Sequence, residues 1–332
     1  MIVDGLDSLD VFVRHQIYVE GYKNGREDDA DDFMTELAAI LLLLLSGKED
    51  IATMSKREIT KFVTTVTRRV SDLLSKYGKR VTAELKDFLF AEVDIITSLY
   101  QPFTKRKINP KKLSGYWTKY LNEINPAYGS EPRAIVRTFL SSALADIQKA
   151  VRQAYANKLT VAETIRSIVG TKALGYKDGV LRKIRNQLIT ALNTLIQQVT
   201  SFLVIELGKL AFDKYQWVSV IDSRTTDTCR HRDGKVYEYG KGPVPPAHYN
   251  CRSTIQPYVD AANDNMPTYR EWIERQPIDV QNDILGTGRA RALRKGEMTA
   301  EGLAKYDGTK PLTLGQYKSK RNKMLTKPQK KA

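Results

Sequence analysis

Apolar residues recur at steps of three and four along residues 59–96, and this spacing constrains the fold more than any other feature of the chain. A helix turns once in about 3.6 residues, so positions spaced in this way share one helical face. The positions are Ile59, Phe62, Val66, Val70, Leu73, Tyr77, Val81, Leu85, Phe88 and Ile96. They predict a long amphipathic helical stretch, which we expect Gly78 to break or kink into two helices.

Helical patterns fill most of the first two hundred residues. The later predicted helices cover residues 135–158, 160–170 and 182–210. At Tyr215 the pattern changes, because "YQWVSVIDS" and then "GKVYEYG" alternate polar residues with β-branched and aromatic ones. The sequence therefore predicts a mainly α (α+β) protein, a multi-helix chain with a small β-rich insert at residues 215–257.

Proline-rich and glycine-rich loops at residues 101–112 and 125–134 are candidate domain boundaries. We predict a helical N-terminal region at residues 1–130, which is a docking or oligomerisation module. A second domain at residues 131–309 contains the β-rich insert, and a basic arm follows at residues 310–332.

The most apolar run is "LAAILLLLL", Leu37–Leu45. It is far shorter than the roughly 20 residues that span a bilayer, so we expect a helix buried between other helices. An interfacial or pore-forming helix is the alternative. The acidic N-terminus lacks a secretory pattern, and two cysteines in 332 residues favour a reducing compartment such as the cytoplasm.

Positive charge is concentrated at the C-terminal end of the chain. The net charge is +15, and residues 310–332 contain eight Lys or Arg and no Asp or Glu. Such arms bind polyanions because neutralised phosphates release counterions, although a solvated tail is the alternative. We predict contacts with DNA phosphates, without base readout, from Lys318, Lys320, Arg321, Lys323, Lys330 and Lys331.

Both cysteines and two of the three histidines lie in "CRHRDGKVYEYGKGPVPPAHYNCR", residues 229–252. If Cys229 and His231 lie in an extended segment, their side chains leave the same face, and His248 and Cys251 are three residues apart. These four could bind a structural Zn²⁺ that clips the insert. The alternatives are a Cys229–Cys251 disulfide, packing without a bond, or a nuclease metal site that uses His231, Asn250 and His248.

Two ordered motif blocks surround these residues. The first is W-x₄-D-x-R-T-x₃-C, then D-G, then P-P-x-H-x-x-C-R, and it comprises Trp217, Asp222, Arg224, Thr225, Cys229, Asp233, Gly234, Pro245, Pro246, His248, Cys251 and Arg252. The second comprises Tyr269, Trp272, Gln276, Pro277, Leu285, Gly286, Arg289 and Leu312–Leu314. Over residues 160–317 this pattern resembles the phage Mu F-like head morphogenesis family of minor head proteins. His231 falls outside the pattern, so Asp233 or Asp222 is an alternative fourth metal ligand.

The resemblance implies a virion protein of low copy number at the portal vertex inside the capsid. It implies the portal protein, packaged double-stranded DNA and a major capsid or scaffolding protein as partners, and an oligomeric state in the virion. Some relatives leave with the genome, so an ejected internal protein is the alternative. No nucleotide-binding loop or catalytic triad stands out, and we expect neither an enzyme nor a small-molecule substrate.

Overall fold

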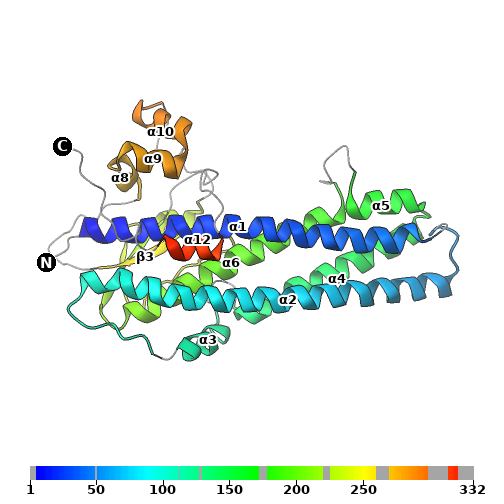
Figure 1. The fold of residues 1–332 in the computed structure, drawn as a ribbon, viewed down its shortest axis with the longest axis horizontal. Helices are drawn as coiled ribbons and strands as arrows, with labels where there is room; N and C mark the ends of the chain where they lie inside the picture. The colour runs from blue at the N-terminus through cyan, green and yellow to red at the C-terminus, as the bar shows by residue number, and fades with distance from the viewer. Residues whose placement is uncertain are drawn as a thin grey trace. The chain divides into compact units, whose positions relative to one another are not determined.

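The structure, a computed structural model, consists mostly of helices, together with one small antiparallel sheet (Figure 1). The structure describes residues 5–48, 51–111, 113–125, 127, 129–171, 178–219, 225–258, 269–297 and 313–320. The helices are α1 (Gly5–Ser46), α2 (Lys56–Tyr100), α3 (Leu113–Leu121), α4 (Pro132–Ala156), α5 (Val161–Val169), α6 (Val180–Gly208), α7 (Asp227–Arg232), α8 (Tyr269–Glu274), α9 (Ile278–Leu285), α10 (Thr287–Arg294) and α12 (Leu314–Ser319), with a 3₁₀ turn at Gln101–Phe103. The predicted fold class is confirmed.

The sheet has the strand order β2-β1-β3. Strand β1 (Lys214–Val218) pairs antiparallel with β2 (Val236–Glu238) and with β3 (Thr254–Pro257). Four of the five β1 residues are buried, as expected for a central strand with both faces covered. The three short strands form one sheet within the predicted range, which also contains α7 (Asp227–Arg232), and β3 was not singled out in the sequence.

The chain forms two compact units, and each unit is built from several segments. Unit 1 contains Met1–Arg26, Leu85–Pro132 and Asn193–Ala332, and unit 2 contains Glu27–Glu84 and Arg133–Leu192. Helices α1, α2 and α6 contribute residues to both units. One border between the units, at Pro132 and Arg133, lies beside the boundary predicted near residue 130. The predicted domains at residues 1–130, 131–309 and 310–332 stay a prediction.

Gly78 does not break α2, so that prediction was wrong. Helix α2 runs without interruption from Lys56 to Tyr100. A Cβ atom on Gly78 would lie 2.8 Å from the Leu140 Cδ1 atom of α4. The glycine therefore permits close packing of α4 against α2, and the tertiary contact outweighs its weak helix propensity of about 1 kcal/mol relative to alanine.

The core of unit 2 is formed by the apolar faces of its helices. Phe33 of α1 stacks on Tyr77 of α2 with ring centroids 4.0 Å apart. Within the leucine run, Leu37, Leu41 and Leu45 are fully buried, whereas Leu43 is 68% exposed. The leucines that are four residues apart therefore form a buried stripe, and the opposite side of the helix is exposed. Only part of the run is buried as predicted.

One described helix, α6, is long and apolar enough to cross a membrane by length and composition. Of its most apolar window, 83% is buried inside the protein. This burial is typical of a core helix, because lipid-facing residues would be exposed in the isolated chain.

Unit 1 holds its C-terminal helix through Tyr317. The Tyr317 ring of α12 lies 5.5 Å from the Tyr22 ring of α1 and 5.3 Å from the Phe88 ring of α2, and Figure 1 shows α12 alongside both helices. The Tyr317 hydroxyl donates to the Glu92 carboxylate at 2.5 Å and lies 3.1 Å from His15 Nε2. All three polar side chains are fully buried. Helix α12 is therefore part of the unit 1 core.

A second buried polar network joins α1 to α6 in unit 1. Lys23 Nζ donates to Glu20 Oε1 and to Gln197 Oε1, each at 2.6 Å. Gln197 Nε2 donates to the Ser253 carbonyl at 3.1 Å, just before β3. The network thus satisfies a buried ion pair and fixes the position of the chain segment that follows Cys251.

We expect Lys23→Met to lower the free energy of unfolding by about 3 kcal/mol, because it leaves the Glu20 carboxylate buried without a cation. The double variant Lys23→Met, Glu20→Gln removes both charges, and its free energy of unfolding should fall by less. Urea unfolding followed by tryptophan fluorescence measures both, since Trp117, Trp217 and Trp272 all lie in unit 1. A double variant less stable than the single one would contradict this account.

Candidate metal centre

Three of the four predicted metal ligands converge in unit 1. Cys229 Sγ lies 3.8 Å from Cys251 Sγ and 3.2 Å from His248 Nε2. The ligand atoms of all three residues lie within 4.8 Å of one another. Both cysteines are buried and have free thiols, and His248 is half-buried. This Cys-His-Cys cluster, Cys229, His248 and Cys251, could bind a metal ion.

His231 does not join the cluster. The expectation that Cys229 and His231 are extended was wrong, because both lie in α7, which Thr226 caps through its side chain. Residues two apart on a helix point about 200° away from each other, so the two side chains leave different faces. His231 is exposed, and its Nε2 atom lies 2.8 Å from Lys235 Nζ.

The orientation of His248 suits a ligand. Its Nδ1 atom lies 2.8 Å from the Tyr249 carbonyl oxygen, which only a protonated Nδ1 can contact favourably. A proton on Nδ1 leaves Nε2, the nitrogen that faces Cys229, as the available lone pair. Metal-binding histidines are commonly held in this way, with the second ring nitrogen donating to a carbonyl.

The cluster also favours a thiolate. The hydrogen bond between Cys251 and Cys229 lowers the pKa of the buried Cys251 thiol, and the hydrogen bond with His248 lowers it further. The bond between the two cysteines, together with burial, raises the pKa of Cys229. The contact with Cys251 raises the pKa of His248. One thiol therefore gives up its proton more readily than the other, and thiolates are the form that binds metals.

Two buried serines support the cluster, and the sequence analysis did not single them out. Ser219 Oγ donates to the Cys229 carbonyl at 2.9 Å and accepts from Trp217 Nε1 at 2.7 Å. It also lies 3.1 Å from Ser253 Oγ, so the segments that carry Cys229 and Cys251 are tied together. Neither serine carries a spacing signal, and only the pairing of β1 with β3 brings them together.

The described motif residues shape the loops around the cluster. Asp233 Oδ1 accepts from the Ser219 amide at 2.6 Å, and Gly234 has φ +75°, a conformation that favours glycine. Pro246 is buried, and the Thr225 carbonyl accepts from Arg230 Nε at 3.1 Å. Pro245 is also buried and Arg252 is half-buried, whereas Asp222 and Arg224 lie outside the described residues.

Only two of the predicted phosphate-binding residues fall in the described part of the chain. Lys318 is exposed, and the Lys320 amine lies 5.9 Å from the centre of the Tyr18 ring. The other four, Arg321, Lys323, Lys330 and Lys331, lie outside the described residues.

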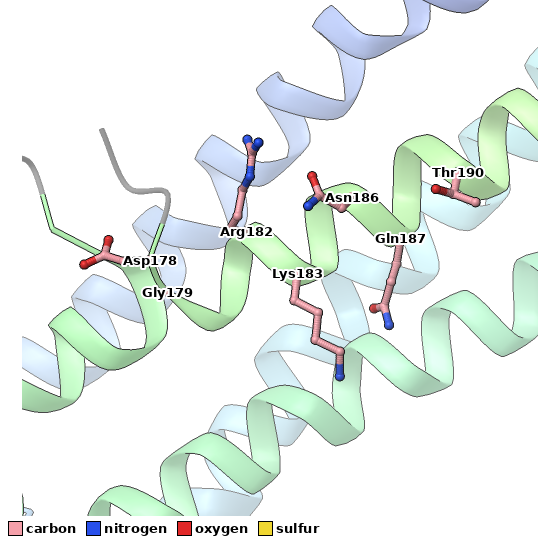
Figure 2. Close-up of a pocket in the computed structure, with 7 residues that line it drawn as sticks. All are labelled: Asp178, Gly179, Arg182, Lys183, Asn186, Gln187 and Thr190. Atoms are coloured by element: carbon pink, nitrogen blue, oxygen red, sulfur yellow. The ribbon is translucent and has the colours of Figure 1, made fainter. Parts of the chain in front are cut away.

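Unit 2 contains a shallow pocket of about 510 Å³ on α6. Figure 2 shows the residues that line it, Asp178, Gly179, Arg182, Lys183, Asn186, Gln187 and Thr190. Lys183 points toward α4, where it donates to Asp146 at 2.8 Å, and Asp178 accepts from Thr171. Because two of its three charged groups are already bonded within the protein, the pocket is a weaker site candidate than the Cys-His-Cys cluster.

Burial raises the pKa of Asp233 from 3.8 to about 6, so folding favours the neutral acid. The fold is then most stable below pH 4 with respect to this group, and it loses that stability as the pH rises to about 6. Asp233→Asn keeps the acceptor for Ser219 but does not titrate. Relative to the natural chain, its free energy of unfolding should therefore rise by roughly 1–3 kcal/mol between pH 4 and pH 8. Urea unfolding at both pH values measures the gain, and an unchanged difference would contradict it.

Comparison with known proteins gives one match. Residues 145–256 match the family model described as Phage Mu protein F like protein. The match includes the Cys-His-Cys cluster, whereas the second predicted motif block lies beyond it and stays a prediction. Searches of curated proteins and of solved structures found no match. Over residues 145–256 the chain is therefore similar to the Phage Mu protein F like family, and the resemblance predicted from its motifs is confirmed for that span.

Proposed function

We propose that the chain is a structural minor head protein of a tailed phage, located inside the capsid at the portal vertex. The observation that carries this proposal is the family match over residues 145–256. The match supports a role in phage head morphogenesis generally and a virion-associated location. The portal position, the portal protein as partner, further contacts with capsid or scaffolding protein and an oligomeric state are the finer parts of the proposal.

The charge distribution supports a contact with packaged DNA. The chain has a net charge of +15, and its arm after Lys320 contains Arg321, Lys323, Lys327, Lys330 and Lys331 without any acid. Helix α12 packs through Tyr317 into unit 1, so the arm leaves from a fixed point. A basic arm on a folded anchor suits non-specific binding of phosphates beside dense DNA.

We propose a structural rather than a catalytic role for the cluster. The nuclease alternative needs His231 to converge with His248, but His231 interacts with Lys235 on the exposed side of α7. Both cysteines are buried, which restricts access of a substrate to their sulfur atoms. These features support a clip for the β-rich insert.

We further propose that the clip binds Zn²⁺. Tetrahedral zinc with bonds of about 2.3 Å to two sulfur atoms sets them about 3.8 Å apart. The Cys229 and Cys251 sulfur atoms lie 3.8 Å apart, far beyond the roughly 2.05 Å of a disulfide bond. Cys229, His248 and Cys251 would hold the ion, which would add folding energy to an insert with a small sheet.

We expect the purified chain to contain about one zinc ion, and Cys251→Ser to lose it. His231→Ala is the matched control and should keep the metal, because His231 lies outside the cluster. Elemental analysis with thiol titration measures both. A metal-free natural chain with two free thiols would contradict the zinc proposal, as would equal loss of metal in both variants.

We expect the chain to co-elute with the portal protein of its own phage after co-expression, and to be present in purified heads. Size-exclusion chromatography and mass spectrometry of particles provide the two measurements. The portal protein of an unrelated phage is the control for non-specific charge attraction. A chain that elutes apart from its portal and is missing from heads would contradict the proposed function.

A further inference from the structure

One exposed face of α2 in unit 2 carries five cations. This α2 basic face consists of Arg57, Lys61, Arg68, Lys76 and Lys79, and each side chain is exposed. The face lies outside the matched residues 145–256 and outside the C-terminal arm. The apolar positions of residues 59–96 that predicted this helix lie on its opposite, buried side.

Four of the five cations are arranged along one line. At about 100° per residue, Arg57, Lys61, Arg68 and Lys79 fall within an arc of about 40°, and Lys76 lies about 60° beyond it. At about 1.5 Å per residue, the line is about 33 Å long. One turn of a DNA duplex measures about 34–36 Å, so the line can follow phosphates over a full turn.

Within the described part of the chain, these charges are only partly offset. None of the five makes a hydrogen bond or an ion pair with another described side chain, whereas neighbouring Arg80 pairs with Glu84 at 4.0 Å. Asp72 lies about 20° beyond the arc, and Glu58 lies at the same angle as Lys76. Hydrogen bonds from Ser55, and to a smaller extent the charge of Lys61, lower the pKa of Glu58. The face therefore presents a strong net positive charge to solvent.

The α2 basic face is separate from the core. Phe62, Val66, Val70, Tyr77 and Val81 are buried on the opposite side of the same helix. Removing exposed charges should therefore leave the packing of unit 2 intact, which allows binding to be tested without unfolding.

We propose that the α2 basic face is a second, folded binding surface for the phosphate backbone of double-stranded DNA. The inference rests on the proposed function only in taking packaged DNA as the available polyanion. The charge line reads no base, and it binds duplexes of any sequence through counterion release. It acts together with the arm but does not depend on it.

A second copy of the chain is the competing occupant, because α1 has a carboxylate-rich stretch from Glu27 to Glu36 in the same unit. That stretch is partly neutralised by its own unit. Asp31 forms a bidentate ion pair with Arg185 of α6. The surplus of cations on the α2 basic face therefore favours a polyanion over this carboxylate stretch.

The test measures binding of the full chain to a 30-base-pair duplex of random sequence over a salt series, by fluorescence anisotropy. The α2 variant carries Lys61→Gln, Arg68→Gln and Lys79→Gln. The charge-matched control carries Lys105→Gln, Arg106→Gln and Lys107→Gln, three exposed cations of a unit 1 loop. A third chain ends at Lys320, which removes the arm but keeps the buried Tyr317.

Log affinity falls linearly with log salt concentration, and each phosphate contact contributes about 0.9 to the steepness of this fall. The α2 variant should therefore make the slope shallower by about 2–3. The control should change it by less than 1, and the chain ending at Lys320 should retain binding that the α2 substitutions then remove. Equal losses in the α2 variant and the control would overturn the surface. So would an unchanged α2 variant, or an α2 variant that changes only self-association in sedimentation.

The outcomes separate this inference from the proposed function. If truncation at Lys320 abolishes binding while the α2 variant binds normally, the surface is wrong and the arm contact stands. If the α2 variant loses binding and truncation has no effect, the surface stands and the arm contact is wrong. A natural chain that binds no duplex at low salt overturns both, while copurification with the portal tests the head function independently.

Discussion

The Gln197 side chain is fully buried in unit 1, and its amide joins groups that are themselves buried. Its oxygen accepts from Lys23, and its nitrogen donates to the Ser253 carbonyl, two residues after Cys251. Ser253 lies against Ser219, which in turn donates to the Cys229 carbonyl. A polar group buried without a partner costs about 1–3 kcal/mol, so the segments in this chain of hydrogen bonds hold one another in place. The separation of the two sulfur atoms depends on this arrangement.

The same arrangement accounts for the division of roles in the proposed function. The Cys-His-Cys cluster lies inside the matched segment, is largely buried and is tied to β1 and β3, which favours a structural clip over a reactive site. The charges proposed to contact DNA lie elsewhere, on the α2 basic face and on the arm that follows α12. In the proposed function, a rigid insert and exposed cations on separate elements would let the protein bind DNA while its thiols stay buried.

Much of the fold could be predicted because helical periodicity is a local signal. Helix α4 begins three residues before its predicted range, and α6 is shifted by two residues at each end. Local signals failed where a tertiary contact dominates. Gly78 indicated a break, but its missing side chain gives Leu140 room to pack. His231 was grouped with Cys229 by spacing in an extended chain, but the Thr226 cap turns that stretch into α7.

The sequence by itself determined the helical class, the position of the β-rich insert, the basic arm and the family motifs, because periodicity, composition and residue spacing are properties of neighbouring residues. Only the tertiary structure decided which three of the four metal-ligand candidates meet, that Tyr317 buries α12 against α1 and α2, and that Gln197 connects α1 to the cysteine-bearing segments. These contacts join residues up to 302 positions apart, as His15 and Tyr317 show. Their geometry follows from strand pairing and helix packing, which no local pattern encodes.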